Sequence, residues 1–271
     1  MSGAEIQLIA LDLDGTLLDE EKKISQQGVE IIKEVMDKGV IVTLVSARPF
    51  CSMLPYAKQL GLKAPLISLS GSYVTDMKQD RILLRKPLDL LKFREMVSML
   101  EDENFYIKVY YENRLLVQEA KQETMDYSRI FGVPYATAGS KGLRKVQVPP
   151  LRIALFDEPL RIQKVLQRLT AWSDYFHTLR DTDRGLEIVE STVSKGAALQ
   201  VLCQELHVPM GNVMAIGNEG SDISMIRAAG FGIAMGNACE ELKRYAIYVT
   251  KTNTECGVGW AIQQYILNKQ L

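Results

Sequence analysis

The sequence lacks long apolar segments and long runs of like charge. No stretch approaches the roughly 20 apolar residues that span a bilayer. The first residues also do not follow the basic, apolar and small-residue order of a signal peptide. We therefore expect a cytoplasmic protein. The formal net charge is -1, which argues against nucleic acid or an anionic membrane as the main partner. A small molecule is the expected ligand.

Cysteine and histidine are also scarce. The four cysteines, at positions 51, 203, 239 and 256, have no C-x-x-C spacing, and the two histidines lie far apart. This distribution predicts neither a zinc site nor a disulfide framework. The rest of the composition is typical of a soluble globular protein, with 271 residues of which 47% are hydrophobic and 24% charged. That length predicts one large or two moderate domains, and the sequence leaves the oligomeric state open.

The segment from Ile6 to Leu18 is the most informative part of the chain. It reads I-Q-L-I-A-L-D-L-D-G-T-L-L, and its apolar first half predicts a strand buried on both faces in a parallel sheet. Because side chains alternate along an extended chain, Asp12 and Asp14 point the same way. Two carboxylates this close repel each other unless a cation or a shared proton offsets their charge. The pair indicates a divalent metal site, although Asp and Gly are also ordinary turn residues.

Strands and helices alternate after these aspartates. Ser25 is the expected N-cap of an amphipathic helix that ends at Gly39. Further segments follow in the order strand 40–45, helix 53–60 and strand 66–69. This alternation predicts a right-handed parallel α/β sheet.

Residues 84–187 form a predicted α+β insert, and residues 1–83 and 188–271 form the predicted core domain. Within the insert we expect a helix that Pro87 opens and that runs to Asn104, then a hairpin of strands 106–111 and 114–118. The other expected segments of the insert are helix 121–131, strand 152–156, helix 160–172 and strands 175–179 and 186–189. The core resumes with helix 194–206, strands 213–216, 231–235 and 245–249, and helix 258–267.

Four polar clusters follow strands or begin helices of the predicted core. They are Asp12 with Asp14, Ser46, Lys195, and the loop 218–222. In an open α/β sheet, ligands bind beyond the carboxyl ends of the strands. Together the clusters offer a carboxylate nucleophile, a second carboxylate, phosphate donors, a cation and oxygen ligands for a metal. That set is suited to phosphoryl transfer.

These motifs resemble those of the haloacid dehalogenase-like (HAD) hydrolase superfamily. The order D-x-D-G-T, S-A-R, S-K-G and G-N-E-G-S-D is similar to its motifs one to four. The segments G-L-E-I at 185–188, G-I-A-M-G-N-A at 232–238 and V-T-K-T-N at 249–253 resemble its Cof-type sugar-phosphate phosphatases. The resemblance implies a Rossmann-like parallel-sheet core with a large inserted α+β cap domain. It also implies a Mg2+-dependent phosphatase of small phosphorylated metabolites, with sugar phosphates as the expected substrates.

The same resemblance implies a role for each motif residue. Asp12 would attack phosphorus and form an aspartyl-phosphate, and Asp14 would protonate the leaving alcohol and then activate water. The implied Mg2+ ligands are Asp12, the Asp14 main-chain carbonyl, Asn218 and Asp222.

The implied phosphate-binding residues are Ser46, Ala47, Lys195 and Ser221. Taken singly, Ser46 is as readily a strand-end cap, and Lys195 is as readily a solvated charge at a helix start. The ordered set of motifs favours the functional interpretation of both residues.

The fourth motif departs from the family pattern G-D-x-x-N-D, because Asn218 and Ser221 replace its first Asp and its Asn. Ala47 likewise stands where Gly is common. An amide oxygen can bind Mg2+ but carries no negative charge, so we expect weak metal binding unless Glu219 or Asp222 compensates. Two alternative functions stay open. One is a phosphomutase of the same superfamily, and the other is a non-catalytic sugar-phosphate sensor.

Overall fold

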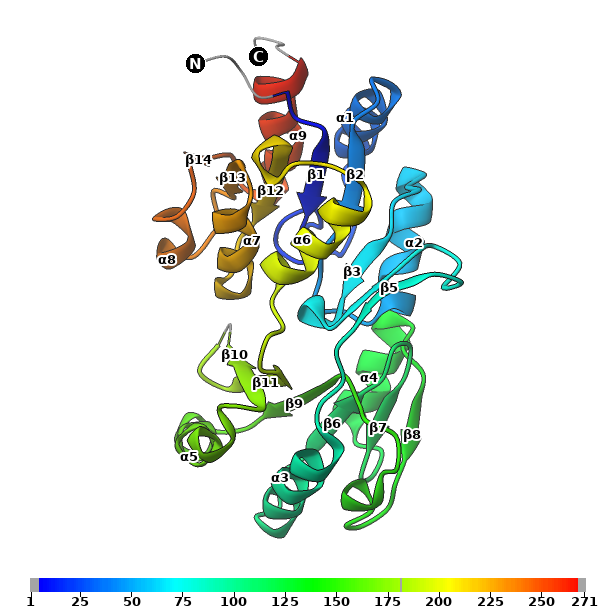
Figure 1. Ribbon diagram of the computed structural model, residues 1–271, viewed down its shortest axis with the longest axis vertical. Helices are drawn as coiled ribbons and strands as arrows, with labels where there is room; N and C mark the ends of the chain where they lie inside the picture. Colours follow the sequence, from blue (N-terminus) through cyan, green and yellow to red (C-terminus); the bar gives the residue numbers. More distant parts are fainter. Residues whose placement is uncertain (1–4, 181, 268–271) are drawn as a thin grey trace. The chain divides into compact units, whose positions relative to one another are not determined.

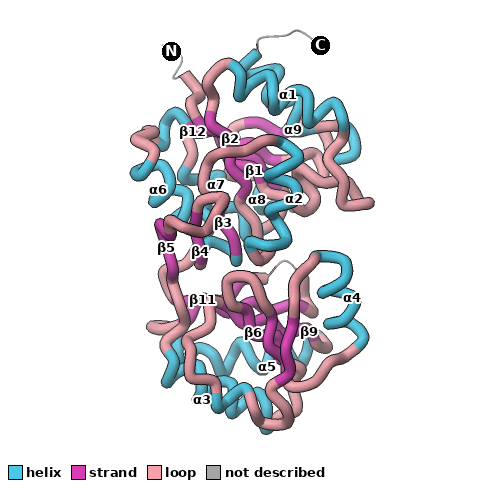
Figure 2. Tube along the Cα trace, turned by 90° about the vertical axis from the view of Figure 1, so that its right-hand side faces the viewer, coloured by secondary structure: helices cyan, strands magenta, loops and turns pink. Residues whose placement is uncertain are grey.

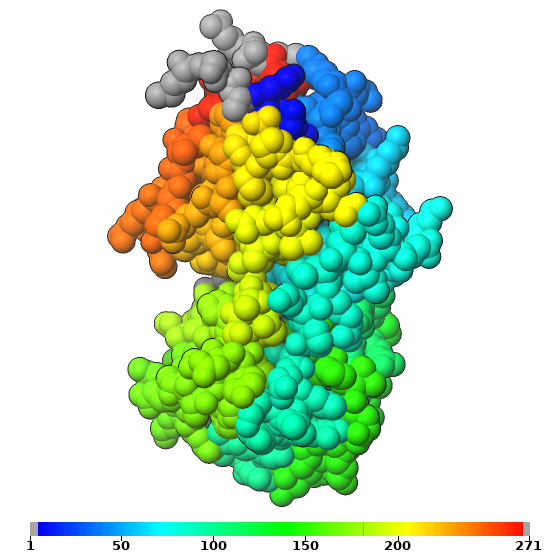
Figure 3. Space-filling view, viewed as in Figure 1, coloured from blue at the N-terminus to red at the C-terminus, as the bar shows by residue number. Residues whose placement is uncertain are grey.

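The chain folds into two compact units. The structure is a computed structural model that describes residues 5–180 and 182–267. The first unit contains residues 5–47, 53–84 and 194–267, and the second contains residues 48–52, 85–180 and 182–193 (Figure 1). The first unit therefore combines segments from both ends of the chain, which pack side by side in Figure 3 as blue and yellow-to-red surfaces.

The central layer of the first unit is a five-stranded parallel sheet. Its order is β14-β13-β12-β1-β2. The strands are β1 (Leu8–Leu11), β2 (Ile41–Leu44), β12 (Val213–Gly217), β13 (Phe231–Ala234) and β14 (Tyr248–Val249). All four residues of β1 are fully buried, because this strand has a neighbour on each side and helices over both faces. The predicted parallel α/β fold class is confirmed.

Helices cover both faces of this sheet. They are α1 (Gln26–Asp37), α2 (Phe50–Leu60), α6 (Lys195–Glu205), α7 (Ile223–Ala228), α8 (Glu240–Lys243) and α9 (Gly257–Ile262), which continues as a π-helical turn over Gln263–Leu267. Helix α1 packs against α9, and α6 packs against α7. Figure 2 shows these two pairs on opposite sides of the sheet. The predicted N-cap of α1 is confirmed, since Ser25 Oγ accepts a hydrogen bond from the Gly28 N–H at 3.1 Å.

A separate small sheet corrects one expectation. The strand predicted at 66–69 is present as β3 (Leu66–Ser68), but it pairs antiparallel with β4 (Tyr73–Thr75) and forms a three-stranded sheet with β5 (Ile82–Arg85). A single parallel bridge between Val45 and Ile67 links it to the end of β2. The chain reverses at Gly71. Its φ is +102°, a backbone conformation that glycine adopts readily and other residues rarely adopt. The reversal gives β3 an antiparallel partner in place of a full parallel ladder.

The second unit is a six-stranded sheet with helices on both faces. Its order is β10-β11-β9-β6-β7-β8. The strands are β6 (Ile107–Tyr110), β7 (Leu115–Val117), β8 (Tyr135–Thr137), β9 (Arg152–Phe156), β10 (Phe176–Leu179) and β11 (Gly185–Glu190). The helices are α3 (Leu90–Asp102), α4 (Gln122–Phe131) and α5 (Pro159–Leu169). The predicted hairpin is confirmed, because β6 and β7 pair antiparallel.

Side chains of β6 show which face each helix covers. Ile107 and Val109 belong to the apolar core that α3 and α5 complete. On the opposite face, Tyr110 and Lys108 contact the Tyr127 ring of α4. This alternation is the period of two expected along a strand.

Two boundaries in the second unit differ from prediction. Pro87 does not open α3, because Asp89 is its N-cap and accepts a hydrogen bond from the Lys92 N–H at 2.9 Å. Strand β11 runs past the predicted insert end at residue 187, so the second unit extends to Val193. In the described parts of the chain, none of the helices has the length and apolar character needed to cross a membrane.

Candidate active site

The backbone of the first unit brings the predicted site residues to one edge of its sheet. The Asp12 N–H donates to Ile216 O at 3.1 Å, and the Val45 N–H donates to Leu11 O at 2.8 Å. Because the three neighbouring strands β12, β1 and β2 are parallel, their carboxyl ends meet there. Asp12 therefore lies between the segment that begins at Ser46 and the loop that begins at Asn218.

A buried lysine lies between two carboxylates at this edge. Lys195 is the first residue of α6, whose N-cap Ser194 accepts a hydrogen bond from the Ala197 N–H at 3.1 Å. Lys195 Nζ donates to Asp12 Oδ1 at 2.8 Å and to Asp222 Oδ1 at 2.5 Å. The exposed fractions are 3% for Lys195, 5% for Asp12 and 0% for Asp222. The three side chains form one charge-paired group shielded from water.

Burial and charge together set the protonation of this group. Burial and the nearby charge of Asp222 raise the pKa of Asp12 from 3.8 to about 7, although the Lys195 ammonium opposes them. Burial alone would lower the pKa of Lys195, but attraction to Asp12 and Asp222 outweighs it and raises the pKa above its ordinary value. Lys195 is therefore a fixed positive charge. Asp12 is a carboxyl group whose ionised form needs further positive charge.

Asp222 is oriented by the backbone as well as by Lys195. Its Oδ2 accepts hydrogen bonds from the N–H groups of Asn218 at 2.9 Å and Glu219 at 3.0 Å. Gly217 makes this possible, because a Cβ there would lie 2.6 Å from the Asp222 Cβ. Both carboxylate oxygens thus accept hydrogen bonds from protein groups. This geometry favours an orienting role for Asp222 over the metal-ligand role expected from the sequence.

The side chain of Asp14 turns toward solvent. Its Oδ1 lies 2.9 Å from Lys22 Nζ, and both side chains are about two-fifths exposed, at 39% and 41%. Lys22 belongs to a tight turn with φ of +61°, and its carbonyl accepts a hydrogen bond from the Tyr56 hydroxyl at 3.1 Å. An exposed ion pair of this kind contributes little to stability. Asp14 is therefore more exposed to solvent than Asp12.

The amide of Asn218 fills the space between Asp12 and the Asp14 backbone. One terminal atom of this amide lies 3.3 Å from Asp12 Oδ2, 2.9 Å from the Asp14 carbonyl oxygen and 2.8 Å from Thr16 Oγ1. The hydrogen-bond network favours nitrogen at this position, since nitrogen donates to all three oxygens. Asn218 is 4% exposed. A Cβ at Gly15 would lie 2.5 Å from the other terminal atom, so residue 15 has to be glycine.

These oxygens also fit a hard cation when the amide is reversed. With Oδ1 inward, the Asn218 amide, Asp12 Oδ2 and the Asp14 carbonyl present three oxygens separated by 2.9 and 3.3 Å along two edges. Adjacent oxygens of an octahedral Mg2+ site lie about 3.0 Å apart. Among residues 5–180 and 182–267, no three His, Cys, Asp or Glu side chains gather as a metal site. A cation here would therefore depend on carbonyl and amide oxygens as well as Asp12.

The remaining predicted residues lie at the same edge through their backbone. The Ser46 N–H donates to Ile67 O at 2.9 Å, and Ser46 O accepts from the Ser70 N–H at 3.1 Å, so the buried Ser46 is firmly placed. Ala47 follows it directly. Ser221 is the middle residue of a short 3-10 turn, Gly220–Asp222. Their predicted phosphate contacts stay predictions.

Two asparagines to which the sequence motifs assigned no role also support the site. Asn237 Nδ2 donates to Gly15 O at 2.8 Å, and its Oδ1 accepts from the Asn253 N–H at 3.1 Å. Asn253 Nδ2 in turn donates to Leu18 O at 2.9 Å. The two side chains thus fix both ends of the loop after Asp14. They occur in the segments G-I-A-M-G-N-A and V-T-K-T-N, whose resemblance to Cof-type proteins was the available signal.

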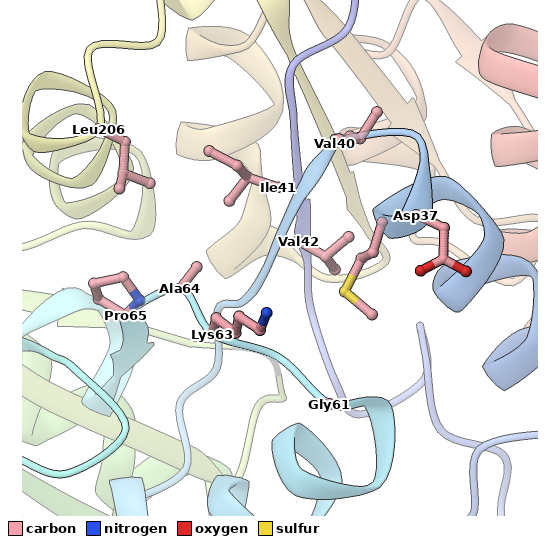
Figure 4. Close-up of a pocket in the computed structure, with 11 residues that line it drawn as sticks. Asp37, Val40, Ile41, Val42, Gly61, Lys63, Ala64, Pro65 and Leu206 are labelled. Carbon is pink, nitrogen blue, oxygen red and sulfur yellow. The ribbon is translucent and has the colours of Figure 1, made fainter.

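A cavity of 440 Å3 lies elsewhere in the first unit (Figure 4). It is lined by the ends of α1 and α2, the start of β2 and residues 63–65. These segments belong to the amino end of β2, whereas Asp12 and Lys195 belong to the carboxyl edge of the sheet. Asp37 and Lys63 are its charged lining residues. The cavity contains none of the predicted site residues.

The profile of the haloacid dehalogenase-like hydrolases matches residues 9–262 of this chain. The chain therefore belongs to the haloacid dehalogenase-like hydrolase family, as its motifs predicted. The match covers the site residues of the first unit and the whole range of the second unit.

Individual relatives cover almost the whole chain. It is 33% identical to the stress response protein YhaX of Bacillus subtilis, over 97% of this chain and 94% of that protein. It is 31% identical to the 5-amino-6-(5-phospho-D-ribitylamino)uracil phosphatase YcsE of Bacillus subtilis, over 97% of each. A solved haloacid dehalogenase-like hydrolase from Bacteroides thetaiotaomicron has a TM-score of 0.86 at 25% identity, covering 96% of this chain and 99% of that one. The predicted hydrolase is confirmed, and the named relatives support phosphatase activity.

Proposed function

We propose that this protein is a Mg2+-dependent phosphatase that hydrolyses small phosphorylated metabolites, with sugar and sugar-alcohol phosphates as the substrate class. The observation that carries the proposal is the Asp12 carboxylate, held 2.8 Å from the buried Lys195 ammonium, with Asp14 two residues further on. A nucleophile, a fixed cation and a more exposed second carboxylate are the groups that two-step phosphoryl transfer needs.

The chain's own residues divide the work as follows. Asp12 attacks phosphorus and forms an aspartyl-phosphate as the alcohol leaves. Asp14, which is more exposed, gives a proton to the leaving oxygen and later takes one from the water that hydrolyses the intermediate. Lys195 keeps its charge throughout and offsets the negative charge that gathers on the phosphoryl oxygens.

Other groups complete the proposed site. Mg2+, held by Asp12, the Asp14 carbonyl and the Asn218 amide oxygen, would supply positive charge to the Asp12 carboxylate and the phosphate. Ser46, the backbone at Ala47 and Ser221 would donate hydrogen bonds to the phosphoryl oxygens. Asp222 would keep Lys195 and the loop from residue 218 in place, because both its oxygens are already engaged by them.

We propose that the second unit acts as the cap that distinguishes substrates. A cavity of 230 Å3 on its α4 face is lined by charged and aromatic side chains. Tyr110 is one of the aromatic residues that line this cavity. Other polar side chains of the second unit already have protein partners: the Tyr111 hydroxyl donates to Val148 O, and Lys141 and Arg184 are paired with Asp102 and Glu158. Cytoplasmic location stays a prediction.

The test is phosphate release from a panel of phosphorylated sugars and sugar alcohols across a Mg2+ titration. The panel includes 5-amino-6-(5-phospho-D-ribitylamino)uracil, because the relative YcsE carries its name. The variant Asp12→Asn should abolish release, since an amide is not a nucleophile toward phosphorus. Asp37→Asn, an exposed residue at the end of α1, is the matched control and should retain activity.

Release that needs Mg2+ and disappears only in Asp12→Asn would support the proposal and rank the substrates. Release that persists in Asp12→Asn would refute the assigned nucleophile. Absence of release at every Mg2+ concentration, combined with a melting temperature that the panel raises, would indicate a sensor instead. Return of the phosphoryl group to a second sugar oxygen would indicate a mutase.

A further inference from the structure

We propose that the side-chain amide of Asn218 turns over when the cation binds, with nitrogen inward in the cation-free protein and oxygen inward in the cation-bound protein. The proposal rests on the Mg2+ dependence proposed above. It assigns to Asn218 a role that an aspartate at this position could not fill, because a carboxylate has no N–H to donate.

The cation-free state is stabilised by the inward nitrogen. In that orientation Asn218 donates to Asp12 Oδ2 at 3.3 Å, to the Asp14 carbonyl at 2.9 Å and to Thr16 Oγ1 at 2.8 Å. The two protons of the amide are thus shared among three oxygens that would otherwise face one another. An amide with partial positive charge on its N–H groups takes the place of a cation.

The orientation with the amide oxygen inward is stabilised by hydrogen bonds with Thr16 and Glu219. With oxygen inward, the Thr16 hydroxyl donates to Asn218 Oδ1 at 2.8 Å, and Asn218 Nδ2 donates to Glu219 Oε1 at 3.4 Å. The inward oxygen then lies next to Asp12 Oδ2 and the Asp14 carbonyl, which repel it. A bound cation removes this repulsion, so it stabilises only this orientation.

Local packing restricts the amide to a rotation in place. The backbone of Asn218 is held by its N–H bond to Asp222 Oδ2 at 2.9 Å and by the Cys239 N–H bond to its carbonyl, also at 2.9 Å. Asn218 is 4% exposed, and the Gly15 backbone lies against its side chain. Rotation about the Cβ–Cγ bond exchanges nitrogen and oxygen without moving the backbone. The hydroxyl of Thr16 accommodates both states, because it can donate or accept.

The turnover lowers the apparent affinity for the cation. Binding has to replace the hydrogen bonds of the inward nitrogen, so only the minor, oxygen-inward population binds directly. In the Asn218→Asp variant this competition is absent, and the ligand gains a negative charge. The variant's cation-free state instead places a carboxylate against Asp12 and the Asp14 carbonyl. Stability without a cation and affinity for a cation should therefore change in opposite directions.

The experiment compares full-length wild type, Asn218→Asp and Asn212→Asp by thermal unfolding. Asn212 lies just before the amino end of β12, so it receives the same substitution at the opposite end of one strand. In EDTA, Asn218→Asp should melt about 5 °C below wild type, and Asn212→Asp within about 2 °C of it. In a MgCl2 titration, Asn218→Asp should gain more in melting temperature, with a half-saturating concentration roughly tenfold lower than wild type.

A second measurement does not depend on the variant's folding. In wild-type protein labelled with 15N-asparagine, the Asn218 side-chain N–H signals should shift on addition of Mg2+, because their partners change from Asp12 and the Asp14 carbonyl to Glu219. Unchanged signals at saturating Mg2+ would overturn the proposal. So would an Asn218→Asp variant as stable as wild type in EDTA, or one with the same Mg2+ midpoint.

Phosphate release is measured separately on the same samples. If wild type releases phosphate but Asn218→Asp shows neither lower stability in EDTA nor higher affinity for Mg2+, the proposed function stands and the amide turnover is refuted. If Asn218→Asp shows both changes but wild type releases no phosphate, the amide turnover is supported and the proposed function is refuted.

Discussion

Replacing Lys195 with methionine removes the positive charge between Asp12 and Asp222 while nearly preserving side-chain length. Nζ lies 2.8 Å from one carboxylate and 2.5 Å from the other, and the lysine is 3% exposed. The substitution leaves two buried carboxylates without the cation that they share. Water does not replace it readily, because the group is shielded from solvent.

The expected loss of stability is large. Removing one partner of a buried ion pair lowers the free energy of unfolding by about 3–5 kcal/mol. Since 1 kcal/mol corresponds to about 2–4 °C in melting temperature for a chain near this size, Lys195→Met should melt roughly 10 °C below wild type at pH 8. Phosphate release should be abolished.

The loss should depend on pH in a definite direction. The pKa of Asp12 is about 7 in the folded wild type against an ordinary 3.8, so the folded state binds a proton more tightly than the unfolded state. Stability from this group is present below about pH 4 and is lost as pH rises through about 7. Lys195 lowers the pKa of Asp12, so its removal extends this range upward. At pH 5.5 the protonated Asp12 no longer repels Asp222, and the melting-temperature loss should be at most about half of that at pH 8.

The assay is thermal unfolding in EDTA at pH 5.5 and pH 8, with Lys58→Met as the control because Lys58 is exposed on α2. The control should match wild type within about 2 °C at both values. An equal loss for Lys195→Met at the two pH values would refute the electrostatic reasoning, since a packing defect has no such pH dependence. A variant as stable as wild type at pH 8 would refute it as well.

Two further predictions concern residues around the site. Asn237→Ala removes the 2.8 Å hydrogen bond to Gly15 O, so kcat should fall about fivefold while KM stays nearly constant. Steady-state kinetics measure both constants. A fall in the melting temperature with unchanged kcat would contradict the positioning role of Asn237. Ser25→Ala removes the N-cap of α1 and should lower the free energy of unfolding, measured by urea denaturation, by about 1 kcal/mol. Ser25→Asp should retain most of the wild-type stability, because aspartate is also a good N-cap. Neither substitution should change the activity.

The sequence was most informative where a local pattern determines the structure. An apolar run that ends in two aspartates predicted both the buried strand β1 and the placement of Asp12 at its carboxyl end, because strand burial and side-chain alternation depend on adjacent residues. The helix predicted over residues 194–206 likewise corresponds to α6. The structure confirms both elements.

Features that depend on distant residues were less predictable. The pairing of β3 with β4 depends on a reversal at Gly71, and the start of α3 depends on whether Pro87 or Asp89 provides the cap. Hydrogen bonds from Asn237 to Gly15 and from Lys195 to Asp222 join residues far apart in the chain. Motif spacing identifies such residues but not which atoms meet, so the orienting role of Asp222 came from the structure.

The assembly of the first unit from two distant segments has a consequence for synthesis on the ribosome. Asp12 and Lys195 are separated by 183 residues, which take about 10–40 s to translate at 5–20 residues per second. During that time the second unit is synthesised, and β1 has no β12 to pair with on one of its two sides. An apolar strand with an unpaired edge is prone to aggregation. Until β12 is synthesised, Leu8–Leu11 can pair only with β2, so one edge of β1 stays open in the nascent chain.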